Sequence, residues 1–375
     1  MHKFLKDTTM LIKFAITNYR GFADRIELDL SHPNNYTFNT FAIKDGVVKN
    51  GIIYGSNGCG KTNFSLAIFD IVNHLSQKWK KLNYYTNFKN AGSKDDAVSF
   101  EYTFNLGGTT LYYNYAKDKN GGLLTEKLSV GKDVVFDKTR DGLEIDGTQF
   151  PIDAKVKDSL AANANQVSIV NYLLTSFPLA HDHYLIKLKD FVNSMLWFRC
   201  LDTREFIGLD TSVTNIEEYI INNGLLEDFH DFLSKVSSQE FEFAEPSKGD
   251  KQILCKYGDG TIPFLQIAST GTQSLQLLFY WIKQMGKASF VFIDEFDAFY
   301  HFRLSYEVCK LLFNLDCQVF TSSHNTYLMT NDLLRPDCNF IIGGNKIKPL
   351  NECTDKELRF GHNIEKMFRG NAFSL

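Results

Sequence analysis

Apolar and polar residues alternate in two short stretches near the start of the chain, at 11–16 and 26–30, on either side of a turn at 18–21. Successive side chains of a β-strand point to opposite faces, so this alternation predicts two half-buried strands. The same pattern returns further along, separated by glycine pairs, at 98–104, 111–115 and 127–130. Strands separated by glycine turns predict an antiparallel meander in this part of the chain.

Continuous apolar runs predict a second kind of strand, buried on both faces, at 51–54, 288–294 and 317–321. Helical spacing of apolar residues over 63–81 and 272–285 predicts one helix after the first run and another before the second. The stretch 155–235 is also mostly helical in pattern, and 355–369 is expected to form a charged terminal helix. Residues 41–43 are expected to form a short strand.

The order of these elements predicts an α/β fold in which a nucleotide-binding core is split by an insertion. A strand, a loop and a helix stand near one end, and a strand, a helix and a strand near the other. We therefore expect an N-terminal part with the meander at 10–130, an insert at 131–264 that is largely helical and returns to strands, and a C-terminal part at 265–375.

Composition narrows the class of protein without naming a function. Of the 375 residues, 44% are hydrophobic and 22% are charged, which is typical of a soluble globular chain and argues against a disordered or fibrous one. The net charge of −4 gives no overall attraction to nucleic acid or to an anionic membrane, although a local basic patch stays possible. No apolar run is long enough to span a membrane, and the seven cysteines include no C-x-x-C pair. We expect a cytoplasmic protein with free thiols and no membrane partner.

Residues 55–62 read Gly-Ser-Asn-Gly-Cys-Gly-Lys-Thr and fit the phosphate-binding pattern G-x-x-x-x-G-K-[ST] in full. The strand predicted before it and the helix predicted after it are the context that the pattern requires. The glycines let backbone N–H groups turn toward an anion, and the helix adds the positive end of its dipole. Lys61 supplies a charge for the outer phosphates of ATP, and Thr62 supplies a hydroxyl for Mg²⁺. Cys59 is interpreted as a tolerated small residue rather than a redox switch.

The apolar run 290–293 ends in two carboxylates, Asp294 and Glu295. Downstream of a phosphate-binding loop, the first carboxylate is expected to hold Mg²⁺, directly or through water. The second is expected to act as general base toward the attacking water. The alternative is a strand that ends in a solvated acidic turn.

Two further segments each allow an ordinary structural interpretation. Residues 268–273 read Ala-Ser-Thr-Gly-Thr-Gln, and Ser269 or Thr270 could be only a helix cap. Residues 321–325 read Thr-Ser-Ser-His-Asn, and His324 could be only a polar residue at the end of a strand. Their order relative to the loop and the carboxylate pair favours a functional interpretation.

That order resembles ABC-type ATPases of the RecF/SMC-like branch rather than membrane transporters. Residues 14–22, Phe-Ala-Ile-Thr-Asn-Tyr-Arg-Gly-Phe, resemble the opening strand and turn of that branch, and 55–63 match its phosphate loop, including Asn63. Residues 294–301 resemble its Walker B and D-loop segments, and 322–325 its switch-histidine segment.

The C-terminal segment 354–366 is similar to a group of stand-alone bacterial AAA-type ATPases that often belong to abortive-infection and anti-phage operons. The resemblance covers about 10–130 and 265–370, whereas no motif can be placed in the insert.

The resemblance implies that ATP lies between two copies of the chain. One copy would bind ATP through Asn57, Gly58, Cys59, Gly60, Lys61, Thr62 and Asn63. Thr62 and Asp294 would hold Mg²⁺, and Glu295, His324 and Lys61 would be the catalytic residues. Ser269 and Gly271 of the other copy would contact the γ-phosphate, and Asp297 would lie at the dimer seam.

Two departures from the family pattern make slow hydrolysis plausible. Thr270 stands where many ABC proteins have a glycine, and no Q-loop glutamine can be placed. The insert has no long heptad run, so extended coiled-coil arms are not expected. The 51 residues after His324 are too few for an appended nuclease domain, so a destructive activity would come from another chain or from the insert.

Three functions follow from these features. The first is an ATPase that acts as sensor and scaffold in an anti-phage system, forms ATP-dependent homodimers or larger assemblies, holds or releases a separate nuclease or toxin, and responds to a phage protein. The second is a RecF-like DNA-repair ATPase that binds DNA directly. The third is a binding module in which nucleotide has only a structural role.

Overall fold

The computed structural model describes residues 8–76, 85–162, 167–199, 206–209, 213, 215–247 and 249–375. Two seven-stranded sheets contain most of its strands. Buried aliphatic and aromatic side chains from both sheets and their helices form one continuous core. The structure thus confirms the predicted α/β class.

The first sheet contains the strands that the continuous apolar runs predict. In chain order its strands are β5 (Asn50–Tyr54), β11 (Leu196–Arg199), β12 (Phe206–Gly208), β15 (Phe290–Asp294), β16 (Gln318–Ser323), β17 (Asn339–Gly343) and β18 (Lys346–Pro349). The spatial order is β12-β11-β15-β16-β5-β17-β18, with the five middle strands parallel and an antiparallel strand at each edge. Every residue of β5, β15 and β16 is buried, as expected for parallel strands covered on both faces.

The second sheet is the predicted meander, and it is antiparallel throughout. Its strands are β1 (Thr9–Thr17), β2 (Ile26–Asp29), β6 (Val98–Leu106), β7 (Thr110–Lys117), β8 (Leu123–Val130), β9 (Asp133–Lys138) and β10 (Leu143–Ile145). They lie in the order β10-β9-β8-β7-β6-β1-β2. Strand β6 alternates strictly between buried and half-buried residues, so one face packs on the core.

The helices are α1 (Lys61–Ile68), α2 (Asp70–Leu75), α3 (Ala154–Ala162), α4 (Ile169–Ser176), α5 (Tyr184–Asn193), α6 (Ile216–Asn222), α7 (Leu226–Ser237), α8 (Phe264–Ile267), α9 (Thr270–Met285), α10 (Phe302–Phe313) and α11 (Ile364–Arg369). Single 3₁₀ turns lie at η1 (Thr40–Ala42), η2 (Thr326–Leu328), η3 (Pro336–Cys338) and η4 (Leu350–Glu352). Two small hairpins pair β3 (Ile43–Lys44) with β4 (Val47–Val48) and β13 (Leu254–Tyr257) with β14 (Gly260–Pro263). None of the described helices is long and apolar enough to cross a membrane.

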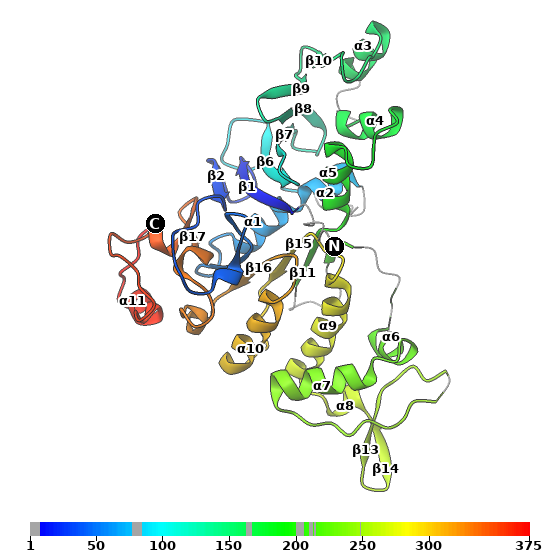
Figure 1. The fold of residues 1–375 in the computed structure, drawn as a ribbon, viewed down its shortest axis with the longest axis vertical. Coiled ribbons are helices and arrows are strands. Elements are labelled where there is room, and N and C mark those ends of the chain that lie inside the picture. The colour runs from blue at the N-terminus through cyan, green and yellow to red at the C-terminus, as the bar shows by residue number, and fades with distance from the viewer. Residues whose placement is uncertain are drawn as a thin grey trace, which may run out of the picture.

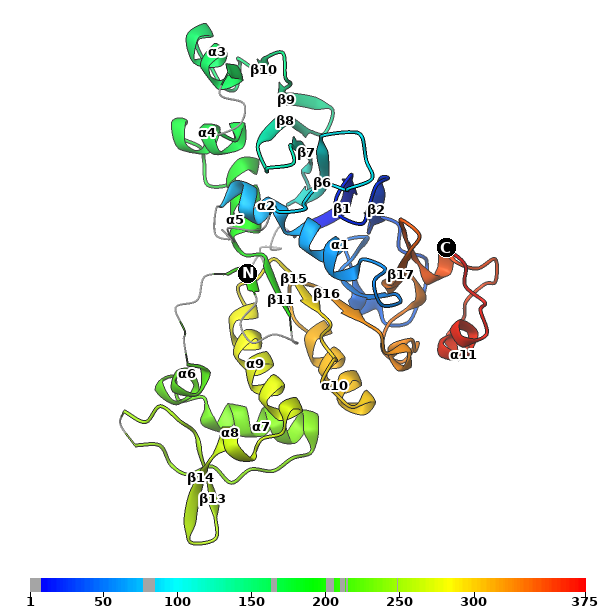
Figure 2. The same ribbon diagram turned by 180° about the vertical axis from the view of Figure 1, so that it is seen from behind.

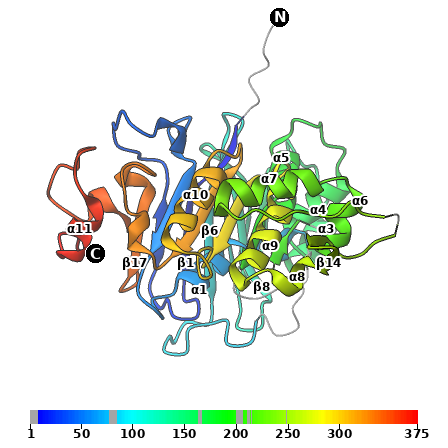
Figure 3. The same ribbon diagram turned by 90° about the horizontal axis from the view of Figure 1, so that it is seen from below.

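The molecule is elongated, with the parallel sheet near its middle. Figures 1 and 2 show the far end of the meander with α3 and α4 at the top, and the β13–β14 hairpin with α6, α7 and α8 at the bottom. Seen from below in Figure 3, α11 and α6 lie at opposite sides of the molecule. The insert therefore contributes to both ends of the long axis.

A buried glutamine joins the two sheets. Gln318, the first residue of β16, accepts a hydrogen bond from the Leu11 amide at 3.0 Å and donates to the Leu11 carbonyl at 2.9 Å. It also donates to the carbonyl of Val48 at 3.0 Å. Because these groups are buried, the Gln318 side-chain amide holds β1 of the meander against β16 of the parallel sheet, although the two strands are not paired.

A second buried cluster joins the meander to the helical insert. Glu126 of β8 accepts hydrogen bonds from the Tyr113 hydroxyl, the Ser168 hydroxyl and the Ile169 amide, each at 2.7 Å. The last two groups belong to the start of α4, where a carboxylate complements the unpaired N–H groups of the helix. Hydrogen bonding to its neighbours keeps the pKa of Glu126 below its ordinary value despite burial, which alone would raise it.

The element boundaries differ from the sequence interpretation in several places. The meander continues through β9 and β10, so the predicted boundary at residue 130 falls inside one sheet. Strands β11 and β12, which lie in the part expected to be helical, belong to the parallel sheet. The expected strand at 41–43 is mostly a 3₁₀ turn, and only 364–369 of the expected terminal helix is helical.

Candidate functional site

The loop 55–62 connects β5 to α1 at the carboxyl edge of the parallel sheet. Gly58 and Gly60 adopt φ values of 75° and 104°, which residues with a Cβ rarely adopt. A Cβ built on Gly60 would lie 2.6 Å from the ring of Phe22, so the turn after β1 packs directly on the loop. Asn63, the third residue of α1, accepts a hydrogen bond from Arg20 of the same turn at 3.1 Å. Glycine is therefore required here for both the backbone curl and the close packing.

The Lys61 amine lies across the mouth of this loop. It donates to the carbonyl oxygens of Gly55 at 2.9 Å and Ser56 at 3.3 Å, and it lies 2.9 Å from Nε2 of His324. His324 directly follows β16, which neighbours β5. Burial lowers the pKa of the Lys61 amine, with neighbouring carboxylates acting in the opposite direction. The predicted phosphate lysine and the predicted switch histidine thus lie together.

Thr62 and Asp294 form the expected pair of oxygen ligands. The Thr62 hydroxyl donates to Oδ2 of Asp294 at 2.7 Å, and the Ser322 hydroxyl donates to Oδ1 at 2.6 Å. Asp294 is fully buried at the end of β15, and burial raises its pKa against the effect of both hydroxyls. A hydroxyl beside a carboxylate is the donor set by which proteins present Mg²⁺ to phosphates, so these residues fit the ion.

Glu295 follows in a left-handed conformation with φ 49°, which turns the chain sharply after β15. Its amide donates to the Ser322 hydroxyl at 2.8 Å. Its carboxylate accepts a hydrogen bond from Nη2 of Arg199 at 2.9 Å. Ser322 therefore fixes the positions of Asp294 and Glu295 together.

Asp297 and His324 line a cavity at the same edge of the sheet. The cavity has a volume of about 540 Å³ and is lined by Asn57, Glu295, Asp297, Ala298, Tyr300, Phe302, His324 and Asn325. Asp297 accepts a hydrogen bond from the Ser323 hydroxyl at 2.7 Å, and burial raises its pKa. The structure thus brings four predicted site residues from three segments around one cavity.

Ser269 and Gly271 lie at the start of α9 and are not among the residues that line this cavity. Ser269 caps the helix by accepting a hydrogen bond from the Thr272 amide at 3.2 Å. A Cβ on Gly271 would lie 3.0 Å from the carbonyl oxygen of Phe299, so α9 begins against the segment that follows Asp297. Ser269 therefore does serve as a helix cap, while its side chain stays exposed to solvent.

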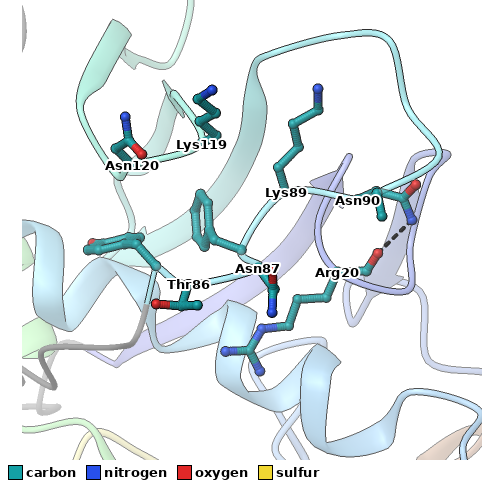
Figure 4. A pocket seen from close by; sticks show the side chains of 10 residues that line it. Arg20, Thr86, Asn87, Lys89, Asn90, Lys119 and Asn120 are labelled. Atoms are coloured by element: carbon teal, nitrogen blue, oxygen red, sulfur yellow. Dashed lines mark hydrogen bonds between the residues drawn. The ribbon is translucent and has the colours of Figure 1, made fainter.

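A second pocket, which was not predicted, includes Arg20 of the turn after β1 in its lining. It has a volume of about 990 Å³, and its lining includes three basic residues and no acidic one: Arg20, Tyr85, Thr86, Asn87, Phe88, Lys89, Asn90, Ala91, Lys119 and Asn120. Figure 4 shows Arg20 extending toward α1, with Lys89 and Lys119 on the other side of the pocket. Arg20 has a φ of 46°, and its carbonyl accepts a hydrogen bond from Asn90 at 2.5 Å.

Sequence reasoning missed Arg199 and the role of Ser322. Arg199 ends β11, and no sequence motif marked this part of the insert. Its position becomes visible only when β11 pairs with β15 and sets Arg199 opposite Asp294. Ser322 lay within the segment assigned to the switch histidine, but nothing in that segment indicated that it holds both carboxylate residues.

Comparison with known proteins gives one family and several similar folds. The model of a family described as "AAA domain, putative AbiEii toxin, Type IV TA system" matches residues 52–330, which is more than half of the chain. No curated protein gives a significant match.

Three of the similar solved structures are SMC head domains. One is an SMC head bound to the C-terminal winged-helix domain of ScpA, with TM-score 0.47, 14% identity, and coverage of 90% of this chain and 96% of that one. Another is the SMC head domain from Thermotoga maritima, with TM-score 0.44, 16% identity, and coverage of 91% and 98%. A third is an Smc head with an extended coiled coil, bound to the C-terminal domain of ScpA derived from Pyrococcus furiosus, with TM-score 0.47, 13% identity, and coverage of 92% and 98%.

Proposed function

Because the chain belongs to the family described as "AAA domain, putative AbiEii toxin, Type IV TA system", we propose that it binds ATP with Mg²⁺ at loop 55–62 and hydrolyses it. Family membership confirms the predicted resemblance to ATPases of the abortive-infection type. The single observation that supports hydrolysis is the convergence of Lys61, Thr62, Asp294, Glu295 and His324 at one edge of the sheet.

The phosphates of ATP are bound by the curled loop and by the Lys61 amine. Backbone N–H groups of the loop and of the first turn of α1 face the anion, which the helix dipole also favours. The Lys61 amine exchanges its contacts with the two loop carbonyls for phosphate oxygens, which carry more negative charge. His324 lies beside Lys61 and contributes a polar contact to the terminal phosphate.

Thr62 and Asp294 would hold Mg²⁺ through their side-chain oxygens. The ion, when bound, supplies positive charge that offsets the charge developing on the transferred phosphoryl group. Ser322 keeps Asp294 in place through its hydrogen bond to Oδ1. Glu295 accepts a proton from the attacking water as general base, and its position next to the metal ligand suits that role.

A second copy of the chain completes the site in this proposal. Ser269 and Gly271 are exposed or half-exposed at the start of α9 and are not part of the lining of the cavity beside the loop. Large apolar side chains are exposed just before α9, at Leu265 and Ile267, and in the segment after Asp297, at Phe299 and Phe302. Such a group of apolar side chains beside a half-formed site is typical of a surface that another subunit covers. Asp297 would lie at the seam.

The biological role we propose is that of sensor and scaffold in an anti-phage system. The family description names a toxin and a toxin–antitoxin system, which supports a separate effector protein that the ATP-bound assembly holds or releases. A phage protein would provide the trigger. Nucleotide state would then act on the partner through dimerisation.

Hydrolysis of ATP by the purified chain tests the proposed activity. Lys61→Ala is expected to abolish Mg²⁺-dependent ATP binding and turnover, because it removes the charge that contacts the outer phosphates. Lys346→Ala, at an exposed lysine on β18, is the matched control and should behave as the native chain does. Equal turnover in the native chain and in Lys61→Ala would reject the proposal.

The basic pocket supports direct DNA binding as a second candidate function. Three cations and three asparagine side chains line it, and Arg20 links it to Asn63 on α1. Lys89 also pairs with Asp96 at 3.0 Å, which partly offsets its charge. If DNA binds there, a labelled oligonucleotide should bind in a salt-sensitive way and stimulate turnover, and Lys119→Glu should weaken both effects. Turnover that DNA leaves unchanged at low salt would remove this candidate.

A further inference from the structure

Arg199 lies against both carboxylate residues that end β15. It is the last residue of β11 and stands opposite Asp294 in the parallel pairing of the two strands. Its Nη2 donates to Oε2 of Glu295 at 2.9 Å, and its Nε lies 3.8 Å from Oδ2 of Asp294. The side chains of Arg199 and Glu295 are only 30% and 21% exposed, so water and salt screen the pair weakly.

This contact opposes the role proposed for Glu295. A general base takes a proton with a carboxylate oxygen that faces the attacking water. One oxygen of Glu295 already accepts a charge-assisted hydrogen bond, which is among the stronger kinds. The Glu295 backbone is also fixed, because its amide donates to Ser322. Arg199 therefore orients the carboxylate and occupies its Oε2, which would otherwise be available to water.

The same guanidinium opposes a cation at Asp294. Arginine keeps its charge at every pH at which the protein is folded. An ion held by Thr62 and Asp294 would bring two positive charges beside it, and a bound divalent cation is usually the largest charge in its site. Like charges repel more strongly where water is partly excluded. The Arg199 contacts and metal binding therefore weaken each other, and this coupling acts equally in both directions.

We propose that Arg199 is a latch that restrains Glu295 until a metal–nucleotide complex displaces it. The inference rests on the proposed ATPase function and adds a means of keeping basal hydrolysis slow. When the metal binds, the guanidinium leaves the two carboxylates and Glu295 can turn toward water. Two residues earlier in β11, Nε1 of Trp197 donates to the Ser65 hydroxyl of α1 at 3.0 Å. The strand that carries the latch is thus tied to the helix that begins in the phosphate loop.

The test is a titration of Mg²⁺ into the full chain at a fixed concentration of a fluorescent, non-hydrolysable ATP analogue. For Arg199→Ala we expect the Mg²⁺ concentration at half-maximal binding to fall at least threefold and basal ATP turnover to rise. Arg199→Lys keeps the positive charge but lacks the planar fork of N–H donors. Its half-maximal Mg²⁺ concentration and its basal turnover should therefore both fall between those of Arg199→Ala and the native chain. Arg25→Ala removes exposed ion pairs to Glu27 and Glu101 on the meander and is the matched control.

The outcomes separate the latch from the function on which it rests. If the native chain needs Mg²⁺ to bind the analogue, and Arg199→Ala reaches half-maximal binding at the same Mg²⁺ concentration, the latch is overturned and the proposed function stands. Reduced turnover in Arg199→Ala with unchanged Mg²⁺ dependence would overturn the latch as well, and would make Arg199 a residue that positions Glu295 for catalysis. If the native chain shows no Mg²⁺-dependent nucleotide binding, the proposed function fails and the latch fails with it.

Discussion

Ser322 holds the two adjacent carboxylate residues of the site through different atoms. Its hydroxyl donates to the side chain of Asp294 and accepts a hydrogen bond from the amide of Glu295. The proposed metal ligand and the proposed general base must occupy distinct positions although they are neighbours in the chain. The left-handed backbone of Glu295 makes that separation possible, because it turns the second side chain away from the strand direction.

Replacing Glu295 by glutamine should separate binding from hydrolysis. The amide has the shape of the carboxylate but cannot accept a proton, so we expect ATP binding to persist and turnover to fall by roughly 10²- to 10⁴-fold. Single-turnover hydrolysis of bound ATP measures the loss. Glu240→Gln, at an exposed position in the insert, provides the control. A variant that hydrolyses ATP as fast as the native chain would show that Glu295 is not the base.

Gly60→Ala should disturb the loop far more than an ordinary glycine substitution does. The new methyl group would meet the Phe22 ring, and alanine disfavours a φ of 104°. We expect a loss of about 1–3 kcal/mol in the free energy of unfolding, and weaker ATP binding, since the loop must shift. Gly142→Ala is the control, because a Cβ there meets nothing within 4 Å. Equal urea midpoints and equal ATP affinities for the two variants would contradict this account of the loop.

The elements that place the site come from parts of the sequence that are far apart. Strands β5, β15 and β16 were predictable, because strands buried on both faces are apolar without alternation and end in marked motifs. Strand β11 was not predictable, since a four-residue apolar run within a helical stretch resembles part of a helix. The pairing of β11 with β15 depends on contacts between residues 95 positions apart in the chain, which local patterns cannot reveal. For the same reason the sequence could not indicate Arg199.

At the scale of elements, Glu126 should be a strong determinant of stability. Glu126→Ala would leave the Tyr113 and Ser168 hydroxyls and the Ile169 amide buried without their acceptor. We expect the free energy of unfolding to fall by about 2–5 kcal/mol, with α4 losing its order first. Urea denaturation measures the change. Glu144→Ala, at an exposed position on β10, should cost far less, and a similar loss in both variants would contradict the assigned role.

At the scale of the whole molecule, the two parts of the proposed site are separate within one chain, because Ser269 and Gly271 do not line the cavity. Asn57 of the phosphate loop and the carboxylates of Glu295 and Asp297 line the cavity, while the signature-like serine caps α9, which begins next to the segment after Asp297. The sequence motifs predicted both groups of residues, and the family resemblance implied that two copies are needed. The structure adds the exposed apolar side chains that flank them.

Nucleotide should therefore control the size of the assembly. We expect Glu295→Gln with ATP and Mg²⁺ to have twice the mass of a single chain or more. The variant cannot hydrolyse the bound ATP, so the contact between copies is not released. Lys61→Ala under the same conditions should remain a single chain. Light scattering coupled to size-exclusion chromatography measures both masses. If the Glu295→Gln chain binds ATP and stays monomeric, one copy of the chain is sufficient to form the ATP site.

The central claim is that each ATP is enclosed by loop 55–62 of one copy and Ser269 of another, and a mixing experiment tests it most directly. Lys61→Ala and Ser269→Arg are expected to be inactive when assayed separately. In an equal mixture, each dimer that contains one of each variant holds one intact composite site, so the mixture should recover turnover that neither variant shows alone. Full activity of Ser269→Arg alone, or no recovery on mixing, would contradict the claim.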